Sequence, residues 1–296
     1  MKNKNKLKID AYAKINLHLD VTEMRDDGYH NIQSIMQSIS LCDEIDIEIT
    51  ENEKIIIQCD KDGLPLDEKN IAYKAASRFF AKAGVRLGAI IKIKKNIPMA
   101  AGLAGGSADG AAVLVGLNRL CNEVLSKDEL YSLGASLGAD IPFCMSCGCC
   151  FTGGIGDVLV PIEPLSANTI LVIACGGEGV STPVAYGLLD KKYNNFIDYV
   201  PKDYKTLTDS IASQNNNFCN HLFNIFEEPI SNERPTVSKI KSIIIDGGAS
   251  AAMMSGSGPS VFGIFANIES AMQTVNALKK QGYFASIASP TVKREL

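Results

Sequence analysis

Residues 98–112 have the sequence PMAAGLAGGSADGAA, and almost all of these side chains are small. Small residues allow a helix to pack closely on a sheet, and they also allow backbone N–H groups and a helix N-terminus to surround a phosphate. Gly102, Gly105, Gly106 and Ser107, which can cap a following helix, have the spacing that a phosphate site requires. The segment is neither a Walker A loop nor a G-x-G-x-x-G fingerprint. The stretch alone leaves both interpretations open.

The composition indicates a soluble globular protein with one large or two modest domains. The chain has 296 residues, 46% of them hydrophobic, and a net charge of −4. An acidic chain has no overall charge that favours nucleic acid or an anionic membrane. No apolar run is long enough to span a bilayer, and no apolar segment of a signal peptide follows the basic N-terminus. We therefore expect a cytoplasmic protein without membrane or nucleic-acid partners.

Residues 8–21, KIDAYAKINLHLDV, alternate strictly between apolar and polar positions. This period predicts a half-buried strand with Lys14, Asn16 and His18 on one face. A turn with Asp-Gly at its centre follows in 22–31. In the glycine stretch, Asp109 is expected in the first turn of the helix that follows, where a negative charge suits the helix dipole.

Further elements follow from periodicity, caps and turn residues. Strands are predicted in 44–50, 54–59, 88–98, 139–153, 168–175, 250–265 (two strands around a glycine loop) and 283–290, and helices in 70–83, 111–121, 126–138, 181–190, 236–249 and 268–282. We also expect helix and loop in 190–217. This order indicates an α+β protein with two domains, 1–160 and 161–296, and glycine loops at their junction.

Four of the nine cysteines lie in CMSCGCC, residues 144–150. Cys144 and Cys147 have the spacing of half a metal site, but neither a second pair nor a nearby histidine completes it. We interpret the segment as buried thiols in a strand, and the metal site is the open alternative.

Three segments in order resemble the motifs of the GHMP kinase superfamily. They are AYAKINLHLDV near the N-terminus, PMAAGLAGGSADGAA as the phosphate loop, and MMSGSGPSVFGIF at 253–265. The segments RDDGYHNIQSIMQSISLCD and LGADIPFC resemble the group in this superfamily that phosphorylates a cytidine-diphosphate-linked methylerythritol. The resemblance implies an N-terminal domain like ribosomal protein S5 domain 2 and a ferredoxin-like C-terminal domain.

The activity implied by the resemblance is transfer of a phosphoryl group from ATP, with Mg²⁺, to the 2-hydroxyl of that small molecule in the non-mevalonate isoprenoid pathway. The implied ATP-binding residues are Pro98, Met99, Ala100, Ala101, Gly102, Leu103, Ala104, Gly105, Gly106, Ser107 and Ala108. Ser107 is also the candidate metal ligand.

The resemblance makes Asp140 the catalytic base and Lys14 its cationic partner. A lysine within about 4 Å of a carboxylate keeps the carboxylate ionised and can stabilise charge on the attacking oxygen. The structural alternative is that Asp140 caps a turn and that Lys14 is a solvated strand residue.

The same resemblance assigns substrate contacts to both halves of the chain. These are Asn16, Tyr29, His30, Asp140, Thr182, Tyr186, Gly256 and Gly258, with Asn224 as a weaker candidate. His30 is expected at the edge of the cytosine, and the rings of Tyr29 and Tyr186 on its faces. The alternatives are an ordinary turn histidine and a core aromatic residue.

Two other functions are compatible with the same motifs. One is a homoserine or mevalonate kinase, but the RDDGYH segment argues against both of these. The other is a non-catalytic nucleotide-binding protein, but the presence of both Lys14 and Asp140 argues against it. We expect a monomer or a weak homodimer.

Overall fold

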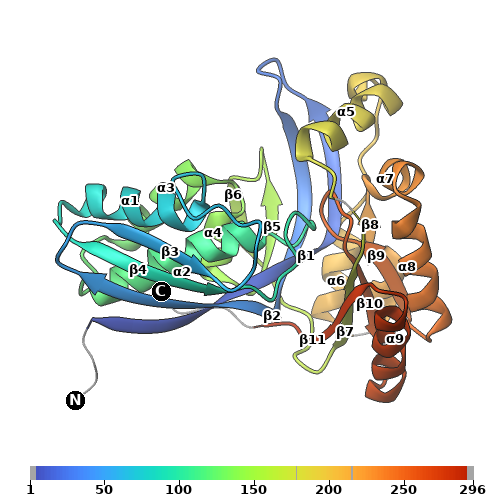
Figure 1. Cartoon of the computed structure of the whole chain (residues 1–296). Coiled ribbons are helices and arrows are strands. Elements are labelled where there is room, and N and C mark those ends of the chain that lie inside the picture. Colours follow the sequence, from blue (N-terminus) through green and yellow to red (C-terminus); the bar gives the residue numbers. More distant parts are fainter. Residues whose placement is uncertain (1–4, 178, 215, 292–296) are drawn as a thin grey trace.

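The computed structural model describes residues 5–177, 179–214 and 216–291, and it has two lobes, each built around one sheet (Figure 1). The first sheet contains β1 (Lys6–Met24), β2 (His30–Thr50), β3 (Ile55–Cys59), β4 (Gly88–Lys94), β5 (Cys149–Gly153), β6 (Val158–Pro161) and β8 (Phe223–Asn224). Its main strand order is β3-β4-β2-β1-β8, with β5 paired to β2 and β6 paired to β5. Because β8 comes from the second half of the chain, this sheet joins the two lobes.

The long hairpin of β1 and β2 runs through both hydrophobic cores. Ile9 and Ile15 of β1 belong to the first core, whereas Leu19 and Val21 belong to the second. The strand is predicted correctly, but the expectation that it is half-buried is wrong. From Ala13 to Val21 both faces are buried, since the second lobe covers the polar face.

A second correction concerns His18. The register between β1 and β2 shifts between Asn16 and His18, as in a β-bulge. A bulge inserts one residue and so turns the following side chains to the opposite face. His18 is therefore separated from Lys14 and Asn16 and packs between the rings of Tyr204 and Phe223.

The helices of the first lobe are α1 (Ile71–Ala83), α2 (Gly105–Leu120), α3 (Lys127–Leu137) and α4 (Ile141–Ser146). Helix α2 packs on β1 and β2, and the other three helices pack around α2 (Figure 1). Two predicted caps are confirmed: Asn70 accepts a hydrogen bond from the backbone of Ala72, and Ser126 and Glu129 form a capping box at α3.

The second lobe has a four-stranded antiparallel sheet of β7 (Ile170–Cys175), β9 (Ala251–Met254), β10 (Val261–Phe265) and β11 (Phe284–Ala288), in the order β11-β7-β10-β9. Helices α8 (Pro235–Asp246) and α9 (Ile268–Lys280) pack on it. Numbered within the lobe, the strand order is 4-1-3-2 with a βαββαβ arrangement, which is ferredoxin-like. The predicted fold class is confirmed.

Shorter elements connect β7 to α8 and complete the second lobe. They are α5 (Thr182–Lys192), the 3₁₀ turn Asn194–Phe196, α6 (Lys205–Ala212), the 3₁₀ turn Asn216–His221 and α7 (Glu227–Glu233). The helix and loop expected in 190–217 are present, except at position 215, which lies outside the described residues.

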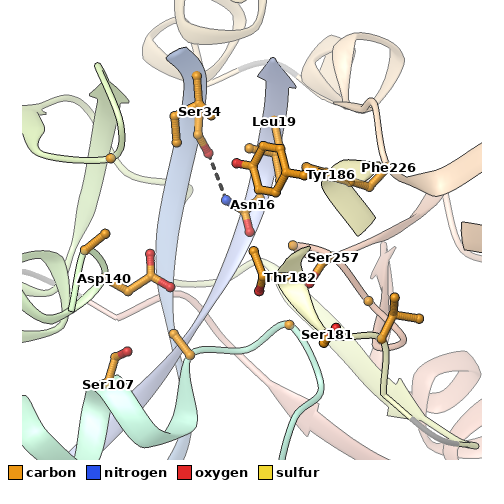
Figure 2. A pocket seen from close by; sticks show the side chains of 18 of the residues that line it. Asn16, Leu19, Ser34, Ser107, Asp140, Ser181, Thr182, Tyr186, Phe226 and Ser257 are labelled. Atoms are coloured by element: carbon orange, nitrogen blue, oxygen red, sulfur yellow. Dashed lines mark hydrogen bonds between the residues drawn. The ribbon is translucent and has the colours of Figure 1, made fainter. Parts of the chain in front are cut away.

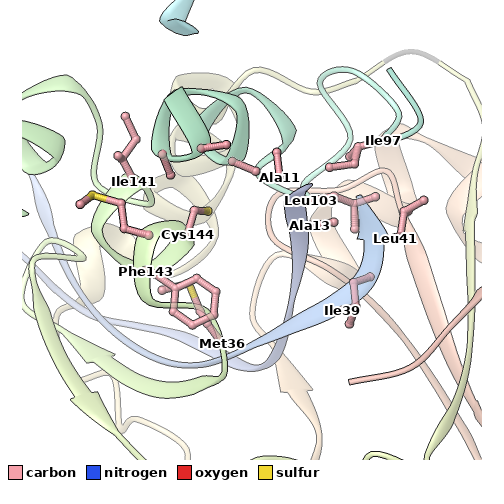
Figure 3. Packing of buried hydrophobic residues seen from close by; sticks show 14 of the residues in the cluster. Ala11, Ala13, Met36, Ile39, Leu41, Ile97, Leu103, Ile141, Phe143 and Cys144 are labelled. Atoms are coloured by element: carbon pink, nitrogen blue, oxygen red, sulfur yellow. The ribbon is translucent and has the colours of Figure 1, made fainter. Parts of the chain in front are cut away.

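The strand predicted across 139–153 is half wrong, because residues 141–146 form helix α4 and only β5 is a strand. Pro142 lies in the first turn of α4, where proline favours a helix, and Gly148 with φ of 83° separates α4 from the strand. All six residues of α4 are buried, so they lack the polar positions that reveal helical period. Figure 3 shows Ile141, Phe143 and Cys144 packed in the core with Met36.

Candidate active site

A cavity of about 950 Å³ lies between the two lobes. Its walls come from β1, the β1–β2 turn, the glycine stretch before α2, the turn before α4, the start of α5 and the loop between β9 and β10. Segments that are far apart in the sequence therefore meet in one place. Most of the residues that the motifs single out lie around this cavity.

The glycine stretch forms one wall of the cavity, and its helix begins earlier than expected. Helix α2 starts at Gly105 and not at Ser107, which is its third residue. The N-cap residue is Ala104, with φ of 56°, and its side chain cannot accept a hydrogen bond. The first N–H groups of α2 therefore have no side-chain cap and face a cavity lined by Gly105, Gly106 and Ser107, which is the arrangement that binds anions.

Leu103 fixes the glycine stretch to the core of the first lobe. Its side chain is buried and packs with Ile97 and Ala13 in the same cluster (Figure 3), and its carbonyl oxygen accepts a hydrogen bond from the backbone N–H of Lys14 at 3.1 Å. Ala108 is also buried. These two of the predicted ATP-binding residues thus position the loop and do not line the cavity.

The second glycine loop packs directly on the first. The hydroxyl of Ser255 donates to the carbonyl oxygen of Gly102 at 3.1 Å, and a Cβ atom on Gly102 would lie 2.2 Å from the carbonyl oxygen of Ser255. The amide of Asn224 donates to the carbonyl oxygens of Met254 and Gly256 at 2.7 and 2.9 Å. Asn224 therefore holds the second loop, while Gly256 and Gly258 line the cavity as predicted.

Lys14 is buried, with 6% of its surface exposed, so the alternative of a solvated strand residue is wrong. Its Nζ donates to Oδ1 of Asn16 at 2.6 Å, and Nδ2 of Asn16 donates to the hydroxyl of Ser34 at 2.8 Å. No ion pair within 4 Å joins Lys14 to Asp140 among the described residues, although both line the cavity. The expected direct contact of the two is therefore absent from this part of the chain.

Asp140 is the N-cap residue of α4, but its side chain makes no capping hydrogen bond. The alternative that this carboxylate serves as a turn cap is therefore wrong. Figure 2 shows the carboxylate pointing into the cavity on the same side as Ser107, opposite Thr182 and Ser257. Burial and the nearby charges of Asp140 and Asp190 raise the pKa of the Tyr186 phenol to about 12. Tyr186 lies at the far end of the cavity from the start of α2 (Figure 2).

That far end contains the residues expected to hold a base. Nε2 of His30 lies 2.6 Å from Oδ1 of Asp190, and the rings of His30 and Tyr186 pack with their centroids 4.6 Å apart. Tyr186 also meets the ring of Phe226 edge-on. Tyr29 also lines the cavity, and this residue is 62% exposed. His30 is therefore not an ordinary exposed turn residue, and a flat base could not fit between His30 and Tyr186 in this arrangement.

Thr182 lies at the first position of α5, which also begins at the cavity. Its N-cap, Ser181, makes no side-chain hydrogen bond to the helix. Both residues line the cavity. The start of α5 therefore presents N–H groups and two hydroxyl groups opposite the start of α2 (Figure 2).

A buried charged cluster lies beneath the glycine stretch. Nζ of Lys95 contacts the carboxylates of both Asp43 and Asp109, the latter at 2.9 Å. Oδ1 of Asp43 accepts the backbone N–H groups of Asn96 and Ile97 at 2.6 and 2.8 Å. The expectation that Asp109 is a first-turn residue is wrong, because it is the fifth residue of α2 and is buried.

Pro98 and Met99 line a neighbouring cavity of about 780 Å³ together with Lys61 and Asp62. Of the other predicted ATP-binding residues, Ala100, Ala101, Gly102, Ala104, Gly105, Gly106 and Ser107 line the main cavity. The predicted stretch therefore runs from one cavity into the other.

Several lining residues were not predicted, among them Ser34, Ser181, Asp190, Phe226 and Ser257. Asp190 could have been found by its spacing, since it follows Tyr186 by one helical turn. Ser34 and Ser257 lie within the motif segments and could have been considered there, whereas Phe226 lies outside them.

The buried cysteines Cys144, Cys147, Cys149 and Cys150 lie in α4, β5 and the turn between them, and none of the four is among the residues that line the cavity. No helix in the described part of the chain could cross a membrane.

Comparison with known proteins places these features in a family. The model of the GHMP kinase N-terminal domain matches residues 70–148, and that of the GHMP kinase C-terminal domain matches residues 202–283. A 4-diphosphocytidyl-2-C-methyl-D-erythritol kinase from Caldicellulosiruptor saccharolyticus is 42% identical over 274 residues, which cover 92% of each chain.

Solved structures agree with this likeness. A crystal structure of a 4-(cytidine 5'-diphospho)-2C-methyl-D-erythritol kinase superposes with a TM-score of 0.78 at 28% identity, over 96% of this chain and 99% of the other. A homoserine kinase from Cytophaga hutchinsonii has a TM-score of 0.72 at 20% identity, over 100% and 97% of the two chains. The latter is a likeness of fold alone.

Proposed function

The chain belongs to the GHMP kinases, in the group of the 4-diphosphocytidyl-2-C-methyl-D-erythritol kinases, and we infer that it phosphorylates the 2-hydroxyl of this substrate with ATP as the donor. The reaction belongs to the non-mevalonate isoprenoid pathway. The observation that supports the proposal best is that one cavity is lined by Asp140, Lys14, the start of α2 and the pair His30–Tyr186.

The start of α2 is suited to hold the ATP phosphates. Its N–H groups lack a side-chain cap, and the helix adds partial positive charge at this end. The glycines allow the phosphates to approach the backbone closely. Ser107 would add a hydroxyl donor from the same turn. The phosphoryl group to be transferred would then lie near Asp140, which points into the cavity on the same side.

Asp140 is proposed to accept the proton of the 2-hydroxyl as its oxygen attacks the γ-phosphorus atom. The O–P bond forms, the bond from the γ-phosphorus to the bridging oxygen breaks, and ADP leaves with the electron pair. Phosphoryl transfer depends mainly on positioning and charge stabilisation. Lys14 is buried and bound to Asn16, so it supplies a fixed positive charge near the attacking oxygen.

The residues present fit a Mg²⁺ ion that is completed by substrate phosphates. No cluster of three or more histidine, cysteine, aspartate or glutamate side chains suited to a metal occurs in the described residues. Mg²⁺ binds through one or two protein oxygens plus phosphates in such sites. Ser107, which lines the cavity in the first turn of α2, offers such an oxygen, and the phosphates and water would complete the coordination. When bound, the ion would neutralise charge on the β- and γ-phosphate oxygens.

The proposed base site uses the other end of the cavity. His30 would meet the cytosine edge and Tyr186 one face, with Tyr29 free to close over the other face because its ring is exposed. Thr182 and the backbone around Gly256 and Gly258 lie between the two ends, where the substrate diphosphate would lie.

The deciding experiment is an ADP-release assay of the purified protein with ATP and three acceptors in parallel. The acceptors are 4-diphosphocytidyl-2-C-methyl-D-erythritol, homoserine and mevalonate. We expect turnover with the first alone. Preferred turnover of another acceptor would assign the chain that other activity, and ATP binding without any turnover would favour the non-catalytic alternative. Sedimentation of the same sample tests the proposed monomer or weak homodimer.

A further inference from the structure

His30 is held by two residues of one helix. Tyr186 and Asp190 are four residues apart on α5, so their side chains lie on the same face of that helix. Tyr186 packs against the imidazole ring, and Asp190 meets its edge at Nε2 at 2.6 Å. The His30 side chain is only 8% exposed, and that of Asp190 is 27% exposed. The ring is therefore fixed in both position and orientation.

The contact with Asp190 determines which ring nitrogen carries the proton. An ionised carboxylate only accepts hydrogen bonds, so Nε2 must be the donor. In a neutral imidazole, Nδ1 is then an acceptor with a free lone pair. No hydrogen bond to Nδ1 is made within the described residues, nor is Nδ1 one of their buried unpaired atoms. It is thus available to a ligand in the cavity that His30 lines.

We propose that Asp190 is a positioning residue that makes His30 selective for a cytosine base over a uracil base. Cytosine presents an amino donor at the ring position where uracil presents a carbonyl acceptor. A lone pair on Nδ1 accepts a hydrogen bond from the amino group and repels the carbonyl. A site built around a substrate hydrogen bond rejects analogues that cannot make it. This inference rests on the proposed function, in which His30 meets the base edge.

The test compares kcat/KM for the cytidyl substrate and for its uridyl analogue. We expect Asp190→Leu to reduce the preference for the cytidyl substrate by about 10- to 100-fold, mostly through KM, because His30 can then adopt either tautomer. Asp190→Asn should keep most of the preference, since its amide oxygen can still accept from Nε2. Asp209→Ala, an exposed carboxylate on α6, serves as the matched control.

A second readout does not depend on turnover. The chain has three histidines, so ¹⁵N NMR of the imidazoles can be assigned with His18→Leu and His30→Gln variants. For the neutral imidazole of His30, we expect the proton at Nε2 in the wild-type protein and a mixture of the two tautomers in Asp190→Leu. Thermal melting confirms that each variant is folded.

Three results would overturn the inference. They are a retained cytidyl preference in Asp190→Leu, equal losses in Asp190→Leu and Asp190→Asn, or an unchanged tautomer in Asp190→Leu. If the wild-type protein phosphorylates neither substrate, the proposed function fails, and the NMR measurement still decides whether Asp190 sets the tautomer.

Discussion

The hydroxyl of Ser255 donates a hydrogen bond to the carbonyl oxygen of Gly102 at 3.1 Å, and so it joins the glycine loops of the two lobes. The same hydroxyl accepts the backbone N–H of Asn16 at 3.3 Å. One side chain thus connects the phosphate loop, the loop of the second lobe and the strand of Lys14. The relative position of the lobes is therefore coupled to the geometry of the site.

Gly102→Ala is expected to destabilise the protein by about 3 kcal/mol or more. Its φ of 76° disfavours a side chain, and the new Cβ would lie 2.2 Å from the carbonyl oxygen of Ser255. Urea unfolding measures the loss. The control for stability is Gly106→Ala, because a Cβ there meets no atom within 4 Å. Equal stability of the two variants would show that the loops are not in tight contact.

Asp140→Asn is expected to lower kcat by about 100- to 10,000-fold and to leave the melting temperature nearly unchanged. Turnover falls because the amide cannot accept the hydroxyl proton. Stability holds because the Asp140 side chain makes no capping hydrogen bond. ADP release and thermal melting are measured on the same sample, with Asp128→Asn as the exposed control. Activity within a few-fold of wild type would remove Asp140 from the role of base.

The sequence predicts those features that depend on neighbouring residues. The caps at Asn70 and Ser126 are local, so they could be recognised from the residue types alone. The alternation in β1 also predicts the strand. It does not predict the bulge between Asn16 and His18, because the register depends on the partner strand. The error in α4 has a similar cause, since a fully buried helix shows no amphipathic period.

In the candidate site, too, the sequence predicts the residues of local motifs but not their contacts with distant residues. The motifs indicate Lys14, Asp140 and the glycine loops, and the structure brings them to one cavity. The residues that contact the predicted site residues could not be predicted from the sequence. Asp190 meets His30 from a position 160 residues away, and Asp43 meets Lys95 from 52 residues away. Such pairs depend on how the lobes and strands pack, which the pattern of a single chain does not specify.

Lys95→Met is expected to cost about 3–5 kcal/mol of folding free energy, because it leaves the buried carboxylate of Asp43 without its counter-ion and removes the hydrogen-bond donor to Asp109. The adjacent Lys94→Met is the matched control. Its ion pair with Glu44 lies at the surface and should contribute about 1 kcal/mol or less. Chemical unfolding of both variants at pH 7 checks the difference. Similar losses of unfolding free energy in the two variants would mean that the buried cluster stabilises the protein no more than the surface ion pair does.

The same cluster should make stability fall as the pH rises from about 4 to 8. Burial raises the pKa of Asp109 to about 8, and the Lys95 charge opposes this only in part. The folded state then binds a proton that the unfolded state releases above its ordinary pKa of 3.8. Asp109→Asn should remove this contribution, so the difference in unfolding free energy between wild type and variant should change across that range. A constant difference would show that Asp109 is ionised in the folded protein.

His18 should contribute a pH dependence of the opposite sign. Its imidazole is fully buried against Tyr204 and Phe223, and neither ring nitrogen has a hydrogen-bond partner among the described residues. Burial lowers its pKa from 6.5 to about 4, so between these values the unfolded state binds a proton that the folded state does not. Acidification from pH 7 to 4 should therefore destabilise the fold by about 3 kcal/mol at most through this group.

His18→Leu provides the measurement for this group, since leucine has a similar volume and no charge to bury. At pH 7 the variant should be as stable as wild type or more stable, because an unpaired polar group is removed from the core. As the pH falls towards 4, the stability of the variant relative to wild type should increase. This increase distinguishes the effect of His18 from that of Asp109, whose contribution to stability changes with pH in the opposite direction. A pH-independent difference would mean that water or a shift of the neighbouring rings lets the folded protein accept the proton on His18.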